Sequence, residues 1–178
     1  DNARDEAGAL AIYQELSASP TAIHSANCNI AYGCIPGHKT TQADAIRAYV
    51  QSLLASQYDT YVRIPRDLWP QEWIDAGMIA PCCKLNKALY GHPEAGGHWE
   101  AHLHKAIQAC GGAAVPNHPS SYWMESTKLL LTVYVDDLLL SGPAASHDSF
   151  WKSFQAADIR IDLPEDLDRF LGRSCVPV

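Results

Sequence analysis

The 178-residue chain is predicted to be an α+β domain built around an antiparallel sheet. Helical and strand-like segments follow one another without the strict strand-helix-strand alternation of a parallel sheet. The segment TVYVDDLLLSG (132–142) is typical of two apolar strands joined by a tight turn. Because 47% of the residues are hydrophobic, the chain has enough apolar mass for one core.

The first part of the chain is expected to alternate between helices and short strands. Leu10, Tyr13 and Leu16 repeat near one helical face, and Pro20 follows that helix. A turn is expected at Pro36-Gly37. The expected elements are a helix at 7–16, a possible short strand at 30–35, a strand at 40–45, a short helix at 48–56 and a strand at 58–64.

The second part begins with a loop-rich insertion at 69–81 and continues with the clearest helix, 94–110. Trp99, Leu103, Ile107 and Cys110 form one stripe of this helix, and a Gly-Gly pair ends it. The remaining expected elements are the hairpin around 129–140, a helix at 150–157 and an ordered end near 170–172.

Two adjacent acids interrupt the apolar hairpin. A two-residue connection would place Asp136 and Asp137 at the turn, where Asp tolerates the left-handed backbone. A solvated Asp-Asp turn is one interpretation. The other is a cation site, because adjacent carboxylates repel each other and a hard cation would remove that cost.

Bulk properties set the context of the domain. Lys and Arg number 13 against 20 Asp and Glu, so the net charge of −7 gives no overall basic field for nucleic acid. Six cysteines without a C-x-x-C pair indicate the thiols of an intracellular protein. No apolar run reaches membrane-spanning length, so no membrane partner is expected. The chain opens on Asp1 and is interpreted as a piece of a longer protein.

Several segments occur in the order of a known family, and the ordered set is more specific than any one of them. The sequence resembles the reverse transcriptase of copia-type LTR retrotransposons over most of residues 40–173. The segments that carry the resemblance are QADAIRAYVQS (42–52), YVRIP (61–65), LNKALYGHPEAGGHW (85–99), YVDD (134–137) and DRFLGR (168–173).

The resemblance implies a polymerase palm-like fold, an antiparallel sheet backed by helices with its carboxylates on the open face, together with part of the fingers. It divides the chain into a fingers-like remnant (1–39), a palm (40–160) and the start of the connection to the primer grip and thumb (161–178). It also implies further domains in a polyprotein, RNase H and integrase among them. Such a protein would act in a cytoplasmic particle or in the nucleus.

By the same resemblance, Asp44, Asp136 and Asp137 are the catalytic acids and the metal ligands. They would hold two Mg²⁺ ions, or Mn²⁺, while deoxynucleoside triphosphates are added to a primer on an RNA or DNA template. Carboxylates suit this chemistry because phosphoryl transfer depends on positioning and charge stabilisation by hard cations. Asp44 and Asp136 are 92 positions apart, yet a shared metal pair requires their carboxylates to lie within roughly 4 to 8 Å.

Three further residues are expected to bind substrate in this family. Tyr49 stands where relatives place an aromatic ring that blocks a ribose 2′-OH, although a core aromatic is an equal alternative. Gly91 and Glu94 fall in the segment that supports the incoming nucleotide. Glu94 replaces a usual Gln and adds negative charge beside a triphosphate, so either it points away or the site is impaired.

Two more positions have a functional and a plain interpretation. Lys87 is expected to meet phosphate or template, or else to be a solvated surface group. Tyr134 is expected to pack against the primer, or else within the sheet.

Two other functions remain open at the level of the sequence. A decayed or domesticated transposon copy would act as a non-catalytic binding module. A zinc-dependent hydrolase would use Glu94, His98 and His102, which recur every four residues on one helix face.

Overall fold

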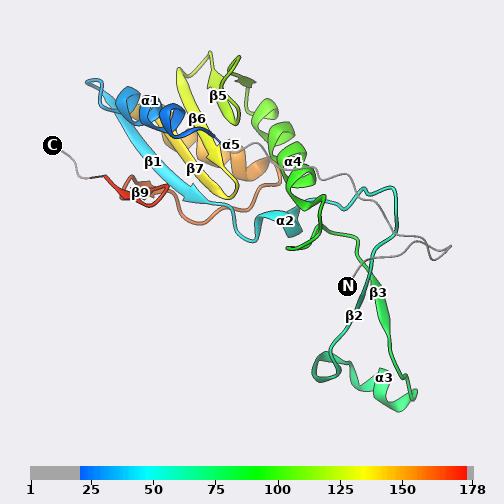
Figure 1. The fold of residues 1–178 in the computed structure, drawn as a ribbon. Coiled ribbons are helices and arrows are strands. Elements are labelled where there is room, and N and C mark those ends of the chain that lie inside the picture. Colours follow the sequence, from blue (N-terminus) through cyan, green and yellow to red (C-terminus); the bar gives the residue numbers. More distant parts are fainter. Residues whose placement is uncertain (1–20, 176–178) are drawn as a thin grey trace.

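The computed structural model describes residues 21–175, which form a body of helices and sheet with one projecting arm (Figure 1). The expected helix at 7–16 lies outside these residues. The elements are α1 (Ile23–Gly33), β1 (His38–Asp44), α2 (Ala48–Gln51), β2 (Tyr61–Arg63), the 3₁₀ turn η1 (Arg66–Leu68), α3 (Gln71–Asp75), β3 (Cys82–Lys84), α4 (Ala95–Ala109), β4 (Gly112–Ala114), β5 (Ser121–Met124), β6 (Leu129–Tyr134), β7 (Asp137–Pro143), the 3₁₀ turn η2 (Ala144–Ser146), α5 (His147–Ala156), β8 (Glu165–Asp166), β9 (Arg169–Phe170) and β10 (Arg173–Ser174).

A six-stranded antiparallel sheet in the order β4-β5-β6-β7-β1-β8 organises the body. Its centre is the β6–β7 hairpin, and β1 pairs with the other edge of β7 along its whole length. The strand predicted at 40–45, the hairpin and the helix predicted at 94–110 are therefore confirmed, and the class is α+β.

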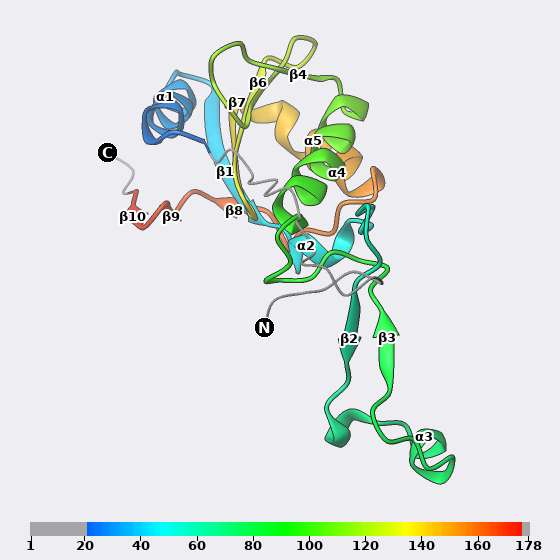
Figure 2. The same ribbon diagram turned by 45° about the vertical axis from the view of Figure 1, so that its right-hand side comes forward.

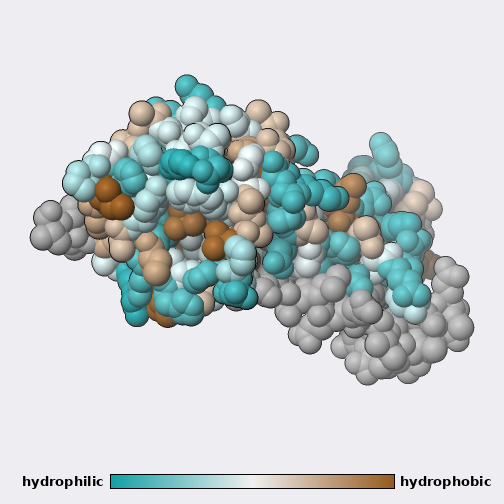
Figure 3. All heavy atoms as spheres, turned by 90° about the horizontal axis from the view of Figure 1, so that it is seen from above, coloured by the Kyte–Doolittle hydropathy of each residue, from teal (hydrophilic) through white to brown (hydrophobic). Residues whose placement is uncertain are grey.

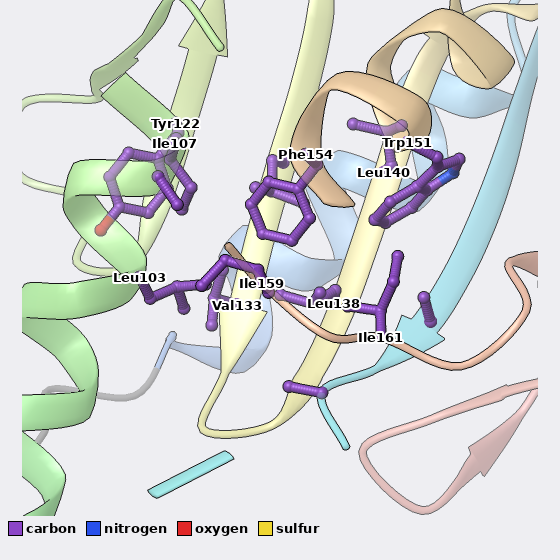
Figure 4. Packing of buried hydrophobic residues seen from close by; sticks show 14 of the residues in the cluster. Leu103, Ile107, Tyr122, Val133, Leu138, Leu140, Trp151, Phe154, Ile159 and Ile161 are labelled. Atoms are coloured by element: carbon purple, nitrogen blue, oxygen red, sulfur yellow. The ribbon is translucent and has the colours of Figure 1, made fainter. Parts of the chain in front are cut away.

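Helices cover both faces of this sheet, with α4 and α5 on one side and α1 on the other (Figure 2). The alternation of side chains along β7 explains the two layers, because successive residues of a strand point to opposite faces. Leu138 and Leu140 pack with Phe154 of α5 in the main cluster (Figure 4). Leu139 packs against Ala26 of α1. The sheet face that was expected to be open is thus partly covered by α1.

The prediction of a strand at 30–35 is wrong, because Ile23–Gly33 forms α1. The buried residues of this helix are Ser25, Ala26 and Asn29, which are small or polar. Asn29 is fully buried, and its amide donates to Leu130 O and Leu139 O, each at 3.1 Å. Apolar periodicity therefore could not reveal the helix, since its buried face is held by hydrogen bonds.

The turn of the hairpin also differs from the prediction by one residue. Tyr134 pairs with Asp137, so the two-residue turn is Val135-Asp136 and Asp137 is the first residue of β7. Val135 has a φ of 58°, which is unusual for a β-branched residue. Trp99 of α4 stabilises this conformation, because its indole N–H donates to Val135 O at 2.7 Å.

The arm consists of the β2–β3 hairpin with η1 and α3 at its far end (Figure 1). It includes the insertion that was expected to be loop-rich, and it exposes Leu68 and Ile79, the latter at 94%. On the face seen in Figure 3, hydrophobic residues occur in separate patches among hydrophilic ones. Within residues 21–175, no helix is long and apolar enough to cross a membrane.

Candidate active site

Three carboxylates, those of Asp44, Asp136 and Asp137, meet at one end of the sheet, where β1 ends and β7 begins. We call this region the acid end. Asp44 is directly opposite Asp137 in the β1–β7 register, and Asp136 occupies the adjoining turn. The backbone fixes this end, because Ala45 N–H donates to Asp136 O at 2.8 Å. The side chains of Asp44 and Asp137 share a hydrogen bond. The backbone register thus brings Asp44 beside the two later acids.

Two of these acids, Asp44 and Asp137, have raised pKa values. Burial raises the pKa of Asp137 to about 6, with the negative charges of Asp44 and Asp136 adding to the effect. Partial desolvation also raises the pKa of Asp44, and the charges of Asp162 and Asp136 raise it further. The interaction between the two side chains raises the pKa of Asp137 and lowers that of Asp44, so Asp137 is the more readily protonated partner.

The chemistry of this donor set fits a hard divalent cation, which prefers carboxylate oxygens and would offset the repulsion. In residues 21–175, however, no group of three or more His, Cys, Asp or Glu side chains already converges on an ion position.

The zinc interpretation of Glu94, His98 and His102 is not borne out, since these side chains form no such group. The physical reason is helix geometry. Eight residues of α-helix rise about 12 Å, too far for the first and last of these side chains to share one tetrahedral ion. Glu94 instead lies beside His98 alone among these residues, with Glu94 Oε2 3.6 Å from His98 Nε2.

The segment that leads into α4 lies beside the acids. The rings of Tyr49 and Tyr90 are 4.5 Å apart between centroids, and Tyr49 is half-buried. Partial desolvation raises the pKa of Tyr90, and the negative charge of Asp136 raises it further. The sequence analysis did not select Tyr90. Its position directly before Gly91 in the LNKALYG segment is the sequence feature that could have identified it as a site residue.

Gly91 and Glu94 have different surroundings. Gly91 is exposed with a φ of 89°, a conformation that glycine adopts without strain as the chain turns toward α4. Glu94 is only 8% exposed, whereas Asp44 is exposed. The carboxylate of Glu94 is therefore shielded from solvent, unlike that of Asp44.

The two remaining predicted residues lie near the site in distinct roles. Lys87 Nζ donates to Gln51 O at 2.8 Å, so Lys87 holds the carboxyl end of α2. Tyr134 ends β6 opposite Asp137 and is 37% exposed, which leaves its ring accessible at the acid end.

A fourth acid was missed by the sequence analysis. Asp162 Oδ1 accepts a hydrogen bond of 2.7 Å from the backbone N–H of Asp44. The two residues are 118 positions apart, and nothing in the local sequence of Asp162 indicates this contact.

The fold and this site define an antiparallel α+β domain with acids gathered at the end of a central hairpin, and carboxylate oxygens are the ligands that hard divalent cations prefer. Residues 12–176 match the reverse transcriptase (RNA-dependent DNA polymerase) family, and the chain belongs to that family. Members of the family generally use divalent metal ions.

A relative from Arabidopsis thaliana supports the same assignment. The chain is similar to the retrovirus-related Pol polyprotein from transposon RE1, with 29% identity over 135 residues. The match covers 74% of this chain and 9% of the plant polyprotein, so the chain corresponds to a small part of that relative's length. The resemblance to copia-type reverse transcriptases is thereby confirmed.

Proposed function

We propose that this chain is the palm-containing part of an RNA-directed DNA polymerase, which extends a primer on an RNA or DNA template with deoxynucleoside triphosphates. The observation that carries the proposal is the meeting of Asp44, Asp136 and Asp137 at one end of a rigid sheet in a reverse transcriptase family member. Nucleotide addition needs little covalent chemistry from the protein, so a fixed cluster of carboxylates is the principal requirement.

The three acids are the ligands for two Mg²⁺ ions in this proposal, and Mn²⁺ suits the same oxygens. When bound, the ions supply activation of the primer 3′-hydroxyl and stabilisation of charge on the triphosphate. Asp137 must lose its proton before its oxygens can serve as ligands. Because its pKa is about 6, cation binding should strengthen as the pH rises through 6 and level off above it.

The pair of tyrosines beside the acids is proposed to select the sugar. The ring of Tyr49 would occupy the space of a ribose 2′-OH, and the ring of Tyr90 supports it from one side at 4.5 Å. Lys87 contributes indirectly, since it holds the end of the short helix that carries Tyr49. Gly91 is proposed to contact the incoming nucleotide, and Tyr134 is proposed to contact the primer.

The wider organisation is proposed from family membership. Residues 1–39 belong to the fingers, 40–160 to the palm and 161–178 to the start of the primer grip and thumb connection. RNase H and integrase domains of the same polyprotein are the proposed partners, in a cytoplasmic particle or the nucleus.

A second candidate function is a non-catalytic binding module, which is favoured by the net charge of −7 and by Glu94. Glu94 is buried whereas Asp44 is exposed, and this difference weakens that alternative.

Primer extension with Mg²⁺ tests the proposal, using the polyprotein segment that contains this chain and its flanking sequence. Asp136→Asn should reduce extension by at least roughly a hundredfold, because a neutral amide is a poor Mg²⁺ ligand. Asp158→Asn is the matched control, since Asp158 is exposed at the end of α5 and its φ of 65° suits Asn. Equal extension by wild type and a folded Asp136→Asn protein would reject the assignment.

A further inference from the structure

A fourth carboxylate, that of Asp162, is hydrogen-bonded to the backbone of the acid end. The connection between α5 and β8 brings Asp162 beside the last residue of β1. Asp44 N–H donates to Asp162 Oδ1 at 2.7 Å, and Asp162 N–H donates to Asp44 O at 3.0 Å. Asp162 therefore satisfies both polar backbone groups of Asp44, one with its side chain and one with its own backbone.

The contact is part of a longer pairing that extends β1 beyond its last residue. Ala45 and Ile161 form an isolated antiparallel bridge, and Ile46 N–H donates to Arg160 O at 2.9 Å. Residues 160–162 thus run antiparallel to residues 44–46. This pairing fixes the chain at the point where Asp44 leaves the sheet.

A buried glutamine ties the same segment to α2. Gln51 is 6% exposed, and its amide nitrogen donates to Ile46 O at 2.8 Å and to Arg160 O at 2.9 Å. Its amide oxygen accepts from Arg160 N–H at 2.7 Å. Because every hydrogen-bonding group of this buried side chain is used, the orientation of α2 relative to Asp44 is well defined.

A neutral side chain would be sufficient for the hydrogen bond to Asp44 N–H, yet the residue at this position is an acid. Its Oδ1 lies 2.7 Å from the backbone nitrogen of Asp44, so its negative charge repels those of the neighbouring acids at short range. Within the described part of the chain, Asp162 forms no ion pair that would offset this repulsion. A carboxylate is an electrostatic cost in the free protein and becomes favourable when a cation is bound nearby.

We propose that Asp162 is a positioning residue of the polymerase site, which holds the backbone of Asp44 and whose negative charge strengthens the binding of divalent cations by the neighbouring acids. The role of Asp162 in catalysis rests on the proposed function. It assigns to Asp162 no direct contact with a metal or a nucleotide.

Two substitutions separate the hydrogen bond from the charge. Asp162→Asn keeps an acceptor oxygen for Asp44 N–H and removes the charge, whereas Asp162→Ala removes both. For Asp162→Asn, the Mg²⁺ concentration that gives half-maximal primer extension should rise roughly threefold to tenfold, with the maximal rate preserved. That range corresponds to one unit charge at about 6 to 13 Å from a divalent ion in a water-like dielectric. Asp158→Asn should behave as wild type.

Backbone amide measurements test the same inference without activity. Hydrogen exchange at the Asp44 amide should be similar in wild type and Asp162→Asn and at least roughly tenfold faster in Asp162→Ala. In a Mg²⁺ titration of the free protein, the amide signals of residues 44, 136 and 137 should shift at higher Mg²⁺ in Asp162→Asn than in wild type.

The outcomes distinguish the two claims. If wild type extends primers but Asp162→Asn has the same Mg²⁺ dependence in both assays, the inference about Asp162 is wrong and the polymerase assignment stands. If wild type does not extend primers yet the variant binds Mg²⁺ more weakly in the titration, the role of Asp162 stands and the proposed function fails. Absence of any Mg²⁺-induced shift in wild type would overturn the inference about Asp162, and if wild type also failed to extend primers, both claims would be overturned.

Discussion

The β6–β7 hairpin has two ends with opposite physical character. In its interior, Leu129, Leu131, Leu138 and Leu140 are completely buried between strands and helices. At its turn, only a few residues away, Asp136 and Asp137 repel each other and Tyr134 is 37% exposed. The interior stabilises the fold, whereas the acid end destabilises it. Such a local cost at the end of a well-packed sheet is typical of a functional site.

The largest effect is expected from a substitution in the interior. Phe154 is fully buried, and its ring stacks on Phe150 at 5.6 Å and meets the edge of Trp151 at 6.1 Å. Phe154→Ala should lower the free energy of unfolding by about 3 to 5 kcal/mol, because the cavity cannot close around so large a deletion. Urea denaturation measures this change. A loss below about 1 kcal/mol would show that the interior does not dominate stability.

A substitution beside the acids should instead change selectivity. Tyr49→Val should raise the ratio of ribonucleotide to deoxynucleotide incorporation at least roughly tenfold, because the removed ring would open space for a 2′-OH. Incorporation of both nucleotide types by single-turnover extension measures the ratio. Tyr90→Phe is the control, since it keeps the supporting ring and should leave the ratio unchanged. The same ratio in Tyr49→Val and wild type would mean that Tyr49 has only a structural role.

Neutralising one acid should stabilise the protein. The folded-state pKa of Asp137, about 6, lies above its ordinary value of 3.8, so the folded state binds more protons between these pH values. Wild-type stability should therefore increase as the pH falls through this window. At pH 7.5, Asp137→Asn should be more stable than wild type by on the order of 1 kcal/mol, a figure reduced for solvent screening because the side chain is half-exposed.

The comparison of wild type and Asp137→Asn by urea denaturation from pH 4 to 8 tests this prediction. The stability difference should shrink toward pH 4, where Asp137 is neutral in the folded wild type. A variant that is less stable than wild type at pH 7.5 would contradict the claim that the acid end is electrostatically unfavourable.

The smallest expected effect is a pH dependence of opposite sign in the interior. His147 is fully buried, where Thr41 Oγ1 lies 2.8 Å from its Nδ1 and Gly142 O lies 3.3 Å from its Nε2. Burial lowers the pKa of His147, so the unfolded state binds the proton more readily. Stability from this residue should be lost as the pH falls below about 6.5. In Asp137→Asn, this loss should be visible without the opposing gain that comes from Asp137, and its absence would mean that His147 is charged in the fold.

The sequence was most informative where local patterns decide structure. The apolar hairpin, the strand ending in Asp44 and the helix with Trp99 at its buried stripe were predicted from periodicity and turn residues. The helix at 23–33 was missed because its buried face contains Ser25 and Asn29, which periodicity does not distinguish from surface residues. The hairpin turn shifted by one residue because a distant indole, that of Trp99, holds Val135 O.

The same distinction applies to the site. Asp44, Asp136 and Asp137 were selected through ordered motifs that resemble a known family. Tyr90 and Asp162 were not, because their roles depend on contacts with residues 41 and 118 positions away in the chain. Such contacts leave no local signal and become visible only when the fold brings the segments together.

The central claim, that the acid end costs stability in order to bind cations, is tested most directly by the free energy of unfolding against Mg²⁺ concentration at pH 7.5. Wild type should gain about 1.4 kcal/mol when Mg²⁺ reaches ten times its dissociation constant, because the ion binds only the folded acids. Asp136→Asn should be at least as stable as wild type without Mg²⁺ and should gain much less with it. Equal gains in both proteins, or no gain in wild type, would contradict the claim.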